Sequence, residues 1–138
     1  MMKLFSQFHV ALFRLSGGRL GSSMQGLNVG LLTSVGRKSG VLRTKPIAVF
    51  EDLGRYVVIA SAGGKPKNPA WYLNIQANPD VTLELKGQTK KHLIAGTVEG
   101  EERERLWNSI VSKQPRFGEY QKKTQRQIPV VILREPRT

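Results

Sequence analysis

The hydrophobic positions of the chain fall mostly into short runs that are typical of β-strands. These runs are rich in Val, Ile and Leu and are bounded by Gly, Asp or Lys. Tight turns at 52–54 and at Gly87 join neighbouring runs, which predicts an antiparallel sheet that closes on itself. The six predicted strands span residues 27–35, 41–50, 56–61, 81–86, 92–98 and 128–133.

Three other segments show helical spacing. Residues 2–16 form a basic amphipathic pattern that the glycines at 17 and 18 end. Such a helix either docks on its own domain, which we favour, or lies on an anionic membrane. Residues 69–77 predict a short helix that crosses between strands, and 101–113 a longer one with acids in its first turn and Lys113 at its end. The pattern divides the chain into a helix and linker at 1–25 and a domain at 26–138.

Charge is distributed unevenly along the 138 residues, and this points to a binding partner. The chain has 22 Lys and Arg against 10 Asp and Glu, a net charge of +12, and its first acidic residue is Glu51. The N-terminal third therefore faces an anionic partner: a phosphorylated cofactor, a lipid surface or nucleic acid. Nucleic acid is the least favoured, because the aromatic residues are not interleaved with the basic ones as a base-stacking groove requires.

Several kinds of chemistry are excluded or disfavoured. The chain has no cysteine, which excludes disulfides and thiol catalysis, and His9 and His92 have no partners at ligand spacing, so we expect no metal site. No P-loop, GxGxxG or GxSxG motif is present. Catalysis would need a borrowed reactive group, which an organic cofactor provides. No run is long enough to span a bilayer and no secretory signal is evident, so we expect a cytoplasmic protein.

The turn between the first two predicted strands could bind an anion. It reads GRKSG, and Gly36 and Gly40 suit a tight turn whose backbone N–H groups point inward. Basic and hydroxyl side chains around it match phosphate or carboxylate chemistry, and the alternative is a solvated hairpin tip. These side chains belong to Arg37, Lys38, Ser39, Arg43 and Lys45.

Two later stretches could form a pocket for a flat ligand. Gly63 and Gly64 follow a strand end and would let a ring approach the backbone, while Ser61 adds a hydroxyl; a flexible linker is the alternative. Phe117 and Tyr120 are three residues apart on a helical turn and either wall a pocket or pack in the core.

Three stretches in order resemble the deazaflavin-dependent nitroreductase family, which uses coenzyme F-420, an 8-hydroxy-5-deazaflavin. They read GLNVGLLTSVGRKSGVLRTKPIAVF, SAGGKPKNPAWYLNIQANPDV and YQKKTQRQIPVVIL and cover roughly residues 26–135. The resemblance implies a six-stranded antiparallel split β-barrel of the FMN-binding type, with an N-terminal helix and two or three flanking helices. It also implies an oxidoreductase that transfers a hydride from reduced coenzyme F-420 to a quinone-like or nitroaromatic acceptor.

The resemblance assigns roles to individual residues. The coenzyme's phosphate and acidic oligoglutamate tail would bind Arg37, Lys38, Ser39 and Arg43. The deazaflavin ring would lie along Pro46, Ala60, Ser61, Ala62, Gly63 and Gly64, with Lys67, Trp71 and Asn74 completing the site. The Ser61 hydroxyl, nearby backbone N–H groups or water would stabilise negative charge on the acceptor. Tyr120 would line the substrate side and orient or protonate the acceptor.

The sequence departs from the family pattern where other members carry tyrosines. Here Ala48, Gln114 and Phe117 stand at those positions. The loss of hydroxyls and ring area changes the pocket and leaves the reduction of bulky nitro compounds open. FMN is the less favoured cofactor. It stays an alternative because split barrels of this type hold either ring. A non-catalytic module that binds lipid or a membrane surface is the other alternative, and peripheral contact with the inner face of the membrane is compatible with catalysis on a quinone.

Overall fold

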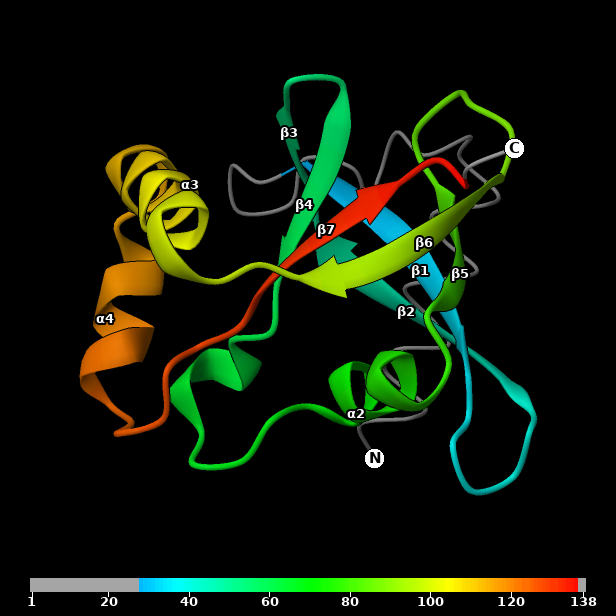
Figure 1. The fold of residues 1–138 in the computed structure, drawn as a ribbon, viewed down its shortest axis with the longest axis horizontal. Helices are drawn as coiled ribbons and strands as arrows, with labels where there is room; N and C mark the ends of the chain where they lie inside the picture. Colours follow the sequence, from blue (N-terminus) through cyan, green and yellow to red (C-terminus); the bar gives the residue numbers. More distant parts are fainter. Residues whose placement is uncertain (1–27, 137–138) are drawn as a thin grey trace.

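The structure is a computed structural model that describes residues 28–136, and these form a curled antiparallel sheet with helices packed beside it (Figure 1). The strand order is β2-β1-β5-β6-β7-β4-β3, and every neighbouring pair is antiparallel. The sequence predicted a sheet that closes on itself, but among the described residues the edge strands β2 and β3 do not pair, so the sheet is a half-barrel that is consistent with a split barrel. Its strands are β1 (Val29–Val35), β2 (Leu42–Ala48), β3 (Phe50–Asp52), β4 (Arg55–Ile59), β5 (Asp80–Glu84), β6 (Lys91–Thr97) and β7 (Val130–Arg134).

Seven strands are present where the sequence predicted six, because the predicted strand at 41–50 divides at Val49. The Val49 N–H still donates to the Asn28 carbonyl at 2.7 Å, which continues the pairing of β2 with β1. Phe50 instead pairs with Val57 of β4. The chain thus passes from a partner on one side of the barrel to a partner on the other, and a hydrophobic run cannot reveal such a change of partner.

Helices cover two regions of the half-barrel. Figure 1 shows α2 (Ala70–Ala77) at the lower end of the barrel and α3 (Gly100–Lys113) and α4 (Arg116–Lys122) together at one side. The structure confirms the predicted helices at 69–77 and 101–113, and α4 is the third flanking helix. A short 3₁₀ helix, η2 (Ala62–Gly64), follows β4. The helix and linker predicted at 1–25 lie outside the described residues.

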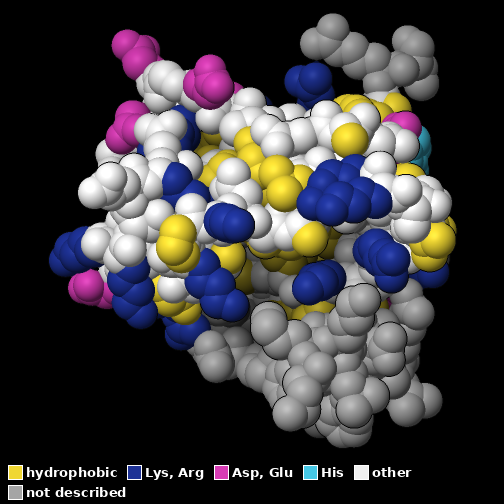
Figure 2. All heavy atoms as spheres, turned by 90° about the horizontal axis from the view of Figure 1, so that it is seen from below, with side chains coloured by type: hydrophobic (Ala, Val, Ile, Leu, Met, Phe, Trp, Pro, Cys, Tyr) yellow, Lys and Arg dark blue, Asp and Glu magenta, His cyan; other side chains and the backbone are white. Residues whose placement is uncertain are grey.

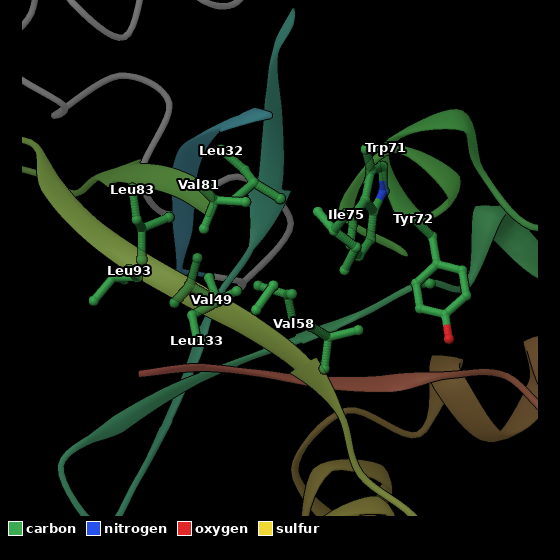
Figure 3. Packing of buried hydrophobic residues seen from close by; sticks show 13 residues of the cluster. Leu32, Val49, Val58, Trp71, Tyr72, Ile75, Val81, Leu83, Leu93 and Leu133 are labelled. Atoms are coloured by element: carbon green, nitrogen blue, oxygen red, sulfur yellow. The ribbon is translucent and has the colours of Figure 1, made fainter. Parts of the chain in front are cut away.

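Two hydrophobic cores lie on the two faces of the sheet, because side chains alternate along each strand. The first fills the inside of the curl and includes Leu32, Val58 and Leu133, and α2 closes it with Trp71 and Ile75 (Figure 3). The second packs α3 and α4 on the outer face of β4 and β7. It includes Val57, Ile132, Leu106, Ile110 and Phe117.

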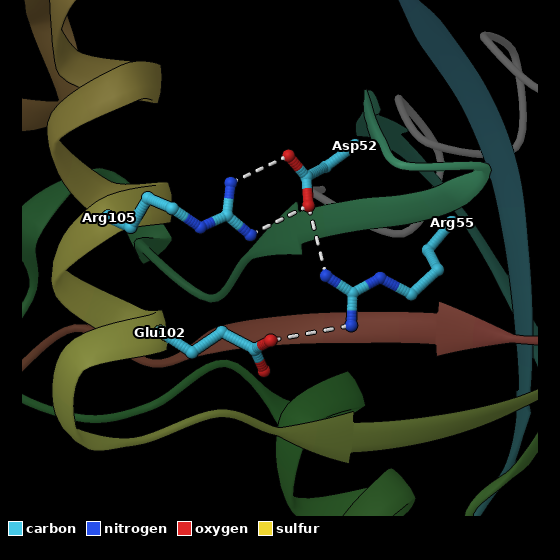
Figure 4. A network of polar contacts seen from close by, with 4 residues as sticks. All are labelled: Asp52, Arg55, Glu102 and Arg105. Atoms are coloured by element: carbon cyan, nitrogen blue, oxygen red, sulfur yellow. Dashed lines mark hydrogen bonds and ion pairs between the residues drawn. The ribbon is translucent and has the colours of Figure 1, made fainter.

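An ion-pair network fixes α3 to the β3–β4 hairpin (Figure 4). Arg105 donates two hydrogen bonds of 3.0 Å to the carboxylate of Asp52, and Arg55 donates a third at 2.9 Å. Arg55 also lies 3.6 Å from Glu102. The hydrogen bond from Arg105 is the main cause that lowers the pKa of Asp52 to about 2, against the opposing effect of burial. This network is a structural anchor on the side of the molecule that carries α3.

Among residues 28–136, no helix is both long enough and apolar enough to cross a membrane.

Candidate active site

A cavity of about 240 Å³ lies in the split of the half-barrel, between β2 and the end of β4. Four segments that are far apart in the sequence line it: β2, the end of β4 with the residues that follow, the start of α2, and α4. It brings together five of the residues predicted to form the site, which are Pro46, Ser61, Ala62, Trp71 and Tyr120. Its other lining residues are Ile47, Ala48, Ile59, Pro69, Arg116 and Phe117.

The edge strand β2 turns backbone groups toward the cavity. The bonds Val49 N–H to Asn28 and Gly36 N–H to Val41 bracket the β1–β2 ladder, so the odd-numbered residues of β2 bond to β1. The N–H and carbonyl of Ala48 and the carbonyl of Pro46 therefore point away from β1, on the side of the split. A proline at such an edge position costs no ladder hydrogen bond.

The loop at residues 60–68 is held by Arg126, whose side chain donates four hydrogen bonds to it. Nη1 donates to the Ala60 carbonyl at 3.2 Å and to Asn68 Oδ1 at 2.7 Å. Nη2 donates to the Ser61 carbonyl at 2.8 Å, and Nε donates to the Lys65 carbonyl at 2.9 Å. Burial lowers the pKa of Arg126. No role for this arginine was predicted from the sequence. Its partners lie about 60 residues away along the chain, and no local sequence pattern reveals such contacts.

The same loop adopts unusual backbone conformations where it meets α4. Gly64 has φ +86°, and a Cβ there would lie 2.6 Å from the carbonyl oxygen of Tyr120. Gly63 also has a positive φ of +66° but has open space around it. Ala62, which lines the cavity, has φ +47°, a conformation that costs a non-glycine residue energy. Only a glycine at 64 lets α4 approach this closely.

The β1–β2 turn is organised mainly by its own backbone. The Gly36 N–H donates to Val41 and the Gly40 N–H donates to Gly36, both at 2.8 Å, and Gly40 has φ +73°. Ser39 Oγ accepts the Val41 N–H at 3.1 Å. Arg37, Lys38 and Ser39 are exposed.

One contact ties this turn to α2. Both the backbone N–H and Nη1 of Arg37 donate to Oδ1 of Asn74 at 3.1 Å. Asn74 is only 5% exposed. The structure thus brings together Arg37 and Asn74, two residues that the resemblance placed in one site, and it shows that the amide oxygen of Asn74 orients the arginine.

Arg43 and Lys45 lie on the inner face of the β1–β2 hairpin. They share this face with Ile47, which packs against the core inside the curl, but both charged side chains are exposed. Neither lines the cavity, and the same holds for Lys38, Ser39 and Lys67. Lys38 and Ser39 belong to the hairpin tip and Lys67 to the 60–68 loop. Figure 1 shows these two segments at the lower end of the barrel, with α2 between them in this view.

Figure 2 looks onto that end of the molecule. Lys and Arg side chains gather around an apolar hollow, and the acidic side chains in view lie toward the rim. No carboxylate is among the residues that line the cavity. Apolar walls, outward-facing backbone groups and a cationic surround suit a flat ring that carries phosphate and carboxylate groups. The residues present therefore fit coenzyme F-420 as a chemical group.

The described part of the chain shows no group of three or more His, Asp or Glu residues that could hold a metal ion. His92 does have an acidic neighbour, since its Nε2 lies 3.1 Å from Asp80 Oδ1, but both side chains are exposed. Two exposed side chains are too few ligands for a metal site.

The half-barrel with a cavity in its split is consistent with the split-barrel class of proteins. Residues 5–135 match the family described as F420H(2)-dependent quinone reductase, and the chain belongs to this family. An F420H(2)-dependent quinone reductase of Mycobacterium tuberculosis is 34% identical over 131 residues, which are 92% of this chain and 87% of that protein.

Two solved structures are similar to this one. One, described as an F420-H2 dependent reductase, has 42% identity and a TM-score of 0.69 over 76% of this chain and 92% of its own. Another, described as a domain-swapped dimer, has 37% identity and a TM-score of 0.70 over 90% of this chain and 98% of its own.

These findings confirm coenzyme F-420 as the cofactor and a quinone as the acceptor, while the nitroaromatic acceptor stays a prediction. The protein is an oxidoreductase of a family that transfers a hydride from reduced coenzyme F-420 to a quinone. The two alternatives from the sequence, an FMN-dependent reductase and a non-catalytic lipid-binding module, receive no support.

Proposed function

We propose that the domain at 26–138 binds coenzyme F-420 with its ring in the cavity of the split and its anionic tail along the β1–β2 hairpin. The observation that carries this proposal is the cavity itself, which gathers Pro46, Ser61, Trp71 and Tyr120 from four separate segments. The cationic end of the barrel adjoins it (Figure 2).

The tail of the coenzyme binds the hairpin through charge-assisted hydrogen bonds. Arg37 is pre-oriented by Asn74, and Arg43 lies on the inner face of the hairpin, beside the turn. The planar fork of an arginine binds phosphate or carboxylate at two oxygens, which lysine cannot do. Lys38 adds charge, and the hydroxyl hydrogen of Ser39 remains a donor, since its oxygen is the acceptor for Val41.

Apolar and backbone groups hold the ring. Pro46 and Trp71 supply flat walls, and the loop after β4 lies along the edge of the ring. Lys67 lies in the same loop and would add charge at the mouth of the cavity. The residues that we assign to the ring are Pro46, Ala60, Ser61, Ala62, Gly63, Gly64, Lys67, Trp71 and Asn74.

When bound, reduced coenzyme F-420 supplies the hydride. The chain's task is to position the acceptor against the ring and to stabilise the negative charge that develops on its oxygen. The Ser61 hydroxyl and the Tyr120 phenol line the cavity and are the donors that we assign to this role. Tyr120 packs edge to face on Phe117, with centroids 5.7 Å apart, so its ring is held in place.

A fluorescence titration of the full chain tests the cofactor site. We expect tight, salt-sensitive binding of coenzyme F-420 and weaker, salt-insensitive binding of its riboflavin-like fragment, which lacks the phosphate and the glutamates. FMN serves as the competing cofactor. Binding of FMN in preference to coenzyme F-420 would contradict the proposal.

Two finer points about the substrate follow from the same face. We include nitroaromatic compounds as slower acceptors, because Ala48 and Phe117 line the cavity without hydroxyl groups.

We also infer peripheral contact with an anionic membrane, supported by the Lys and Arg side chains around the cavity (Figure 2). The protein should sediment with vesicles that contain phosphatidylglycerol and stay in solution with neutral ones, and equal partitioning would contradict this contact.

A further inference from the structure

We propose that Arg126 is a positioning residue, which aims and strengthens a pair of backbone N–H donors at Ser61 and Ala62. These donors stabilise the negative oxygen that forms during hydride transfer. The inference rests on the proposed function, because it takes the cavity in the split as the place of reaction. Three steps lead from the structure to this role.

The first step is the conformation of the loop. Ser61 is right-handed, with φ −77° and ψ −36°, and Ala62 that follows it has φ +47°. A right-handed residue followed by a left-handed one turns successive N–H groups to one side and forms a concavity that binds anions. Both residues line the cavity.

The second step is the direction of the peptide groups. Arg126 donates to the carbonyls of Ala60 and Ser61 at 3.2 and 2.8 Å. In a trans peptide the N–H points opposite to the carbonyl, so the N–H groups of Ser61 and Ala62 point away from the guanidinium. A cation on the carbonyl side also polarises each peptide and makes its N–H a better donor.

The third step is the connection to the wall that carries Tyr120. Gln121, the next residue on α4, donates from Nε2 to the Arg126 carbonyl at 2.7 Å and accepts the Ile128 N–H at Oε1 at 3.0 Å. The segment that carries Arg126 is therefore tied to α4. Arg126 in turn fixes the loop, so the two sides of the cavity share one support.

Arg126 and Arg105, the arginine that anchors α3, have different kinds of hydrogen-bond partner. This difference supports a functional role for Arg126 beyond a contribution to stability. The bonds of Arg105 go to the carboxylate of Asp52, which compensates its charge. The four bonds that the structure gives Arg126 all go to neutral oxygens, while burial lowers its pKa. A partly buried cation held against neutral carbonyls costs desolvation, and its field is directed through the peptides that line the cavity.

Single-turnover kinetics of the full chain test the inference, with reduced coenzyme F-420 and menadione both at saturation. Arg126→Gln should slow hydride transfer about 100-fold, the effect of losing one aligned oxyanion donor, with a smaller change in the KM for menadione. Arg126→Lys keeps the charge but not the fork and should recover only part of the rate. The matched control is Arg105→Gln, which should lower the melting temperature and leave the rate per folded molecule within about twofold.

Each outcome decides the question. A rate for folded Arg126→Gln equal to wild type, or an equal loss in Arg105→Gln, would overturn the inference. If Arg126→Gln does not fold, Asn68→Ala removes one of the four bonds and should slow transfer about fivefold, and an unchanged rate would overturn the inference as well. A wild-type protein that neither binds coenzyme F-420 nor reduces menadione would instead refute the proposed function.

Discussion

The β1–β2 turn and the loop at 60–68 lie at the same end of the barrel, but different interactions hold them. The turn is exposed and is shaped by hydrogen bonds among Gly36, Gly40 and Val41, with one long-range contact to Asn74. The loop is shaped by Arg126 and by its close approach to α4.

The difference matches the tasks that we assign to the two segments. Attraction between a phosphate and an arginine falls off slowly with distance, so a locally held turn suffices to bind an anionic tail. Hydride transfer depends on the placement of reacting atoms to within about an ångström, so the ring and the acceptor need a loop fixed by distant parts of the chain. Changes in the turn should therefore weaken binding, and changes in the loop should slow the reaction.

The largest effect should come from Gly64→Ala in the loop. The new methyl group would lie 2.6 Å from the Tyr120 carbonyl at a φ of +86°, so we expect a loss of about 3 kcal/mol in the free energy of unfolding. Gly63→Ala is the matched control, since it has φ +66° and no neighbour, and should cost only about 1 kcal/mol. Thermal and urea unfolding measure both, and equal costs would show that α4 does not close on the loop.

A substitution in the β1–β2 hairpin should change only the binding of coenzyme F-420. Arg43→Ala removes a charge-assisted bond to the tail and should weaken binding of coenzyme F-420 by about 1.5 to 3 kcal/mol, with hydride transfer at saturation unchanged. The riboflavin-like fragment should bind equally to the variant and to wild type. Arg134→Ala, an exposed arginine on β7, is the control for net charge. A variant that binds the fragment more weakly would place Arg43 at the ring instead.

Removing one hydroxyl at the cavity should have a moderate effect. Tyr120→Phe keeps the edge-to-face contact with Phe117 and should leave stability unchanged. Loss of one hydrogen bond should raise the free energy of the transition state by about 1 kcal/mol, which lowers kcat/KM for the quinone roughly fivefold. Steady-state kinetics measure it, and full activity would remove Tyr120 from the reaction.

The smallest functional effect should come from the anchor of α3, which lies outside both segments. The pKa of Asp52 is lowered to about 2, so its contribution to stability is present above its unfolded pKa near 4 and is lost as the pH falls toward 2. Asp52→Asn should cost about 1 to 2 kcal/mol at pH 7, and most of this cost should be gone near pH 2, with coenzyme binding unchanged at pH 7. Urea unfolding at several pH values follows this difference, and a constant cost would contradict it.

Much of the fold was predictable from local pattern. The strands, the helices at 69–77 and 101–113 and the turn at GRKSG all follow from the spacing of apolar residues and from glycine positions. The sequence also marked Ser61, Trp71 and Tyr120, which the structure then placed around one cavity. It did not reveal the division of the second strand at Val49 or the tie between Arg126 and the loop.

The sequence by itself determined which segments become strands and helices, where the positive charge lies and, through its resemblance, the family. These properties depend on residues that are near one another along the chain. Only the tertiary structure decided that β2 and β4 border a cavity and that Arg126 bonds to Ala60, 66 positions earlier. The physical reason is that hydrogen bonds and packing act over a few ångströms in space, and the folded sheet alone brings those positions together.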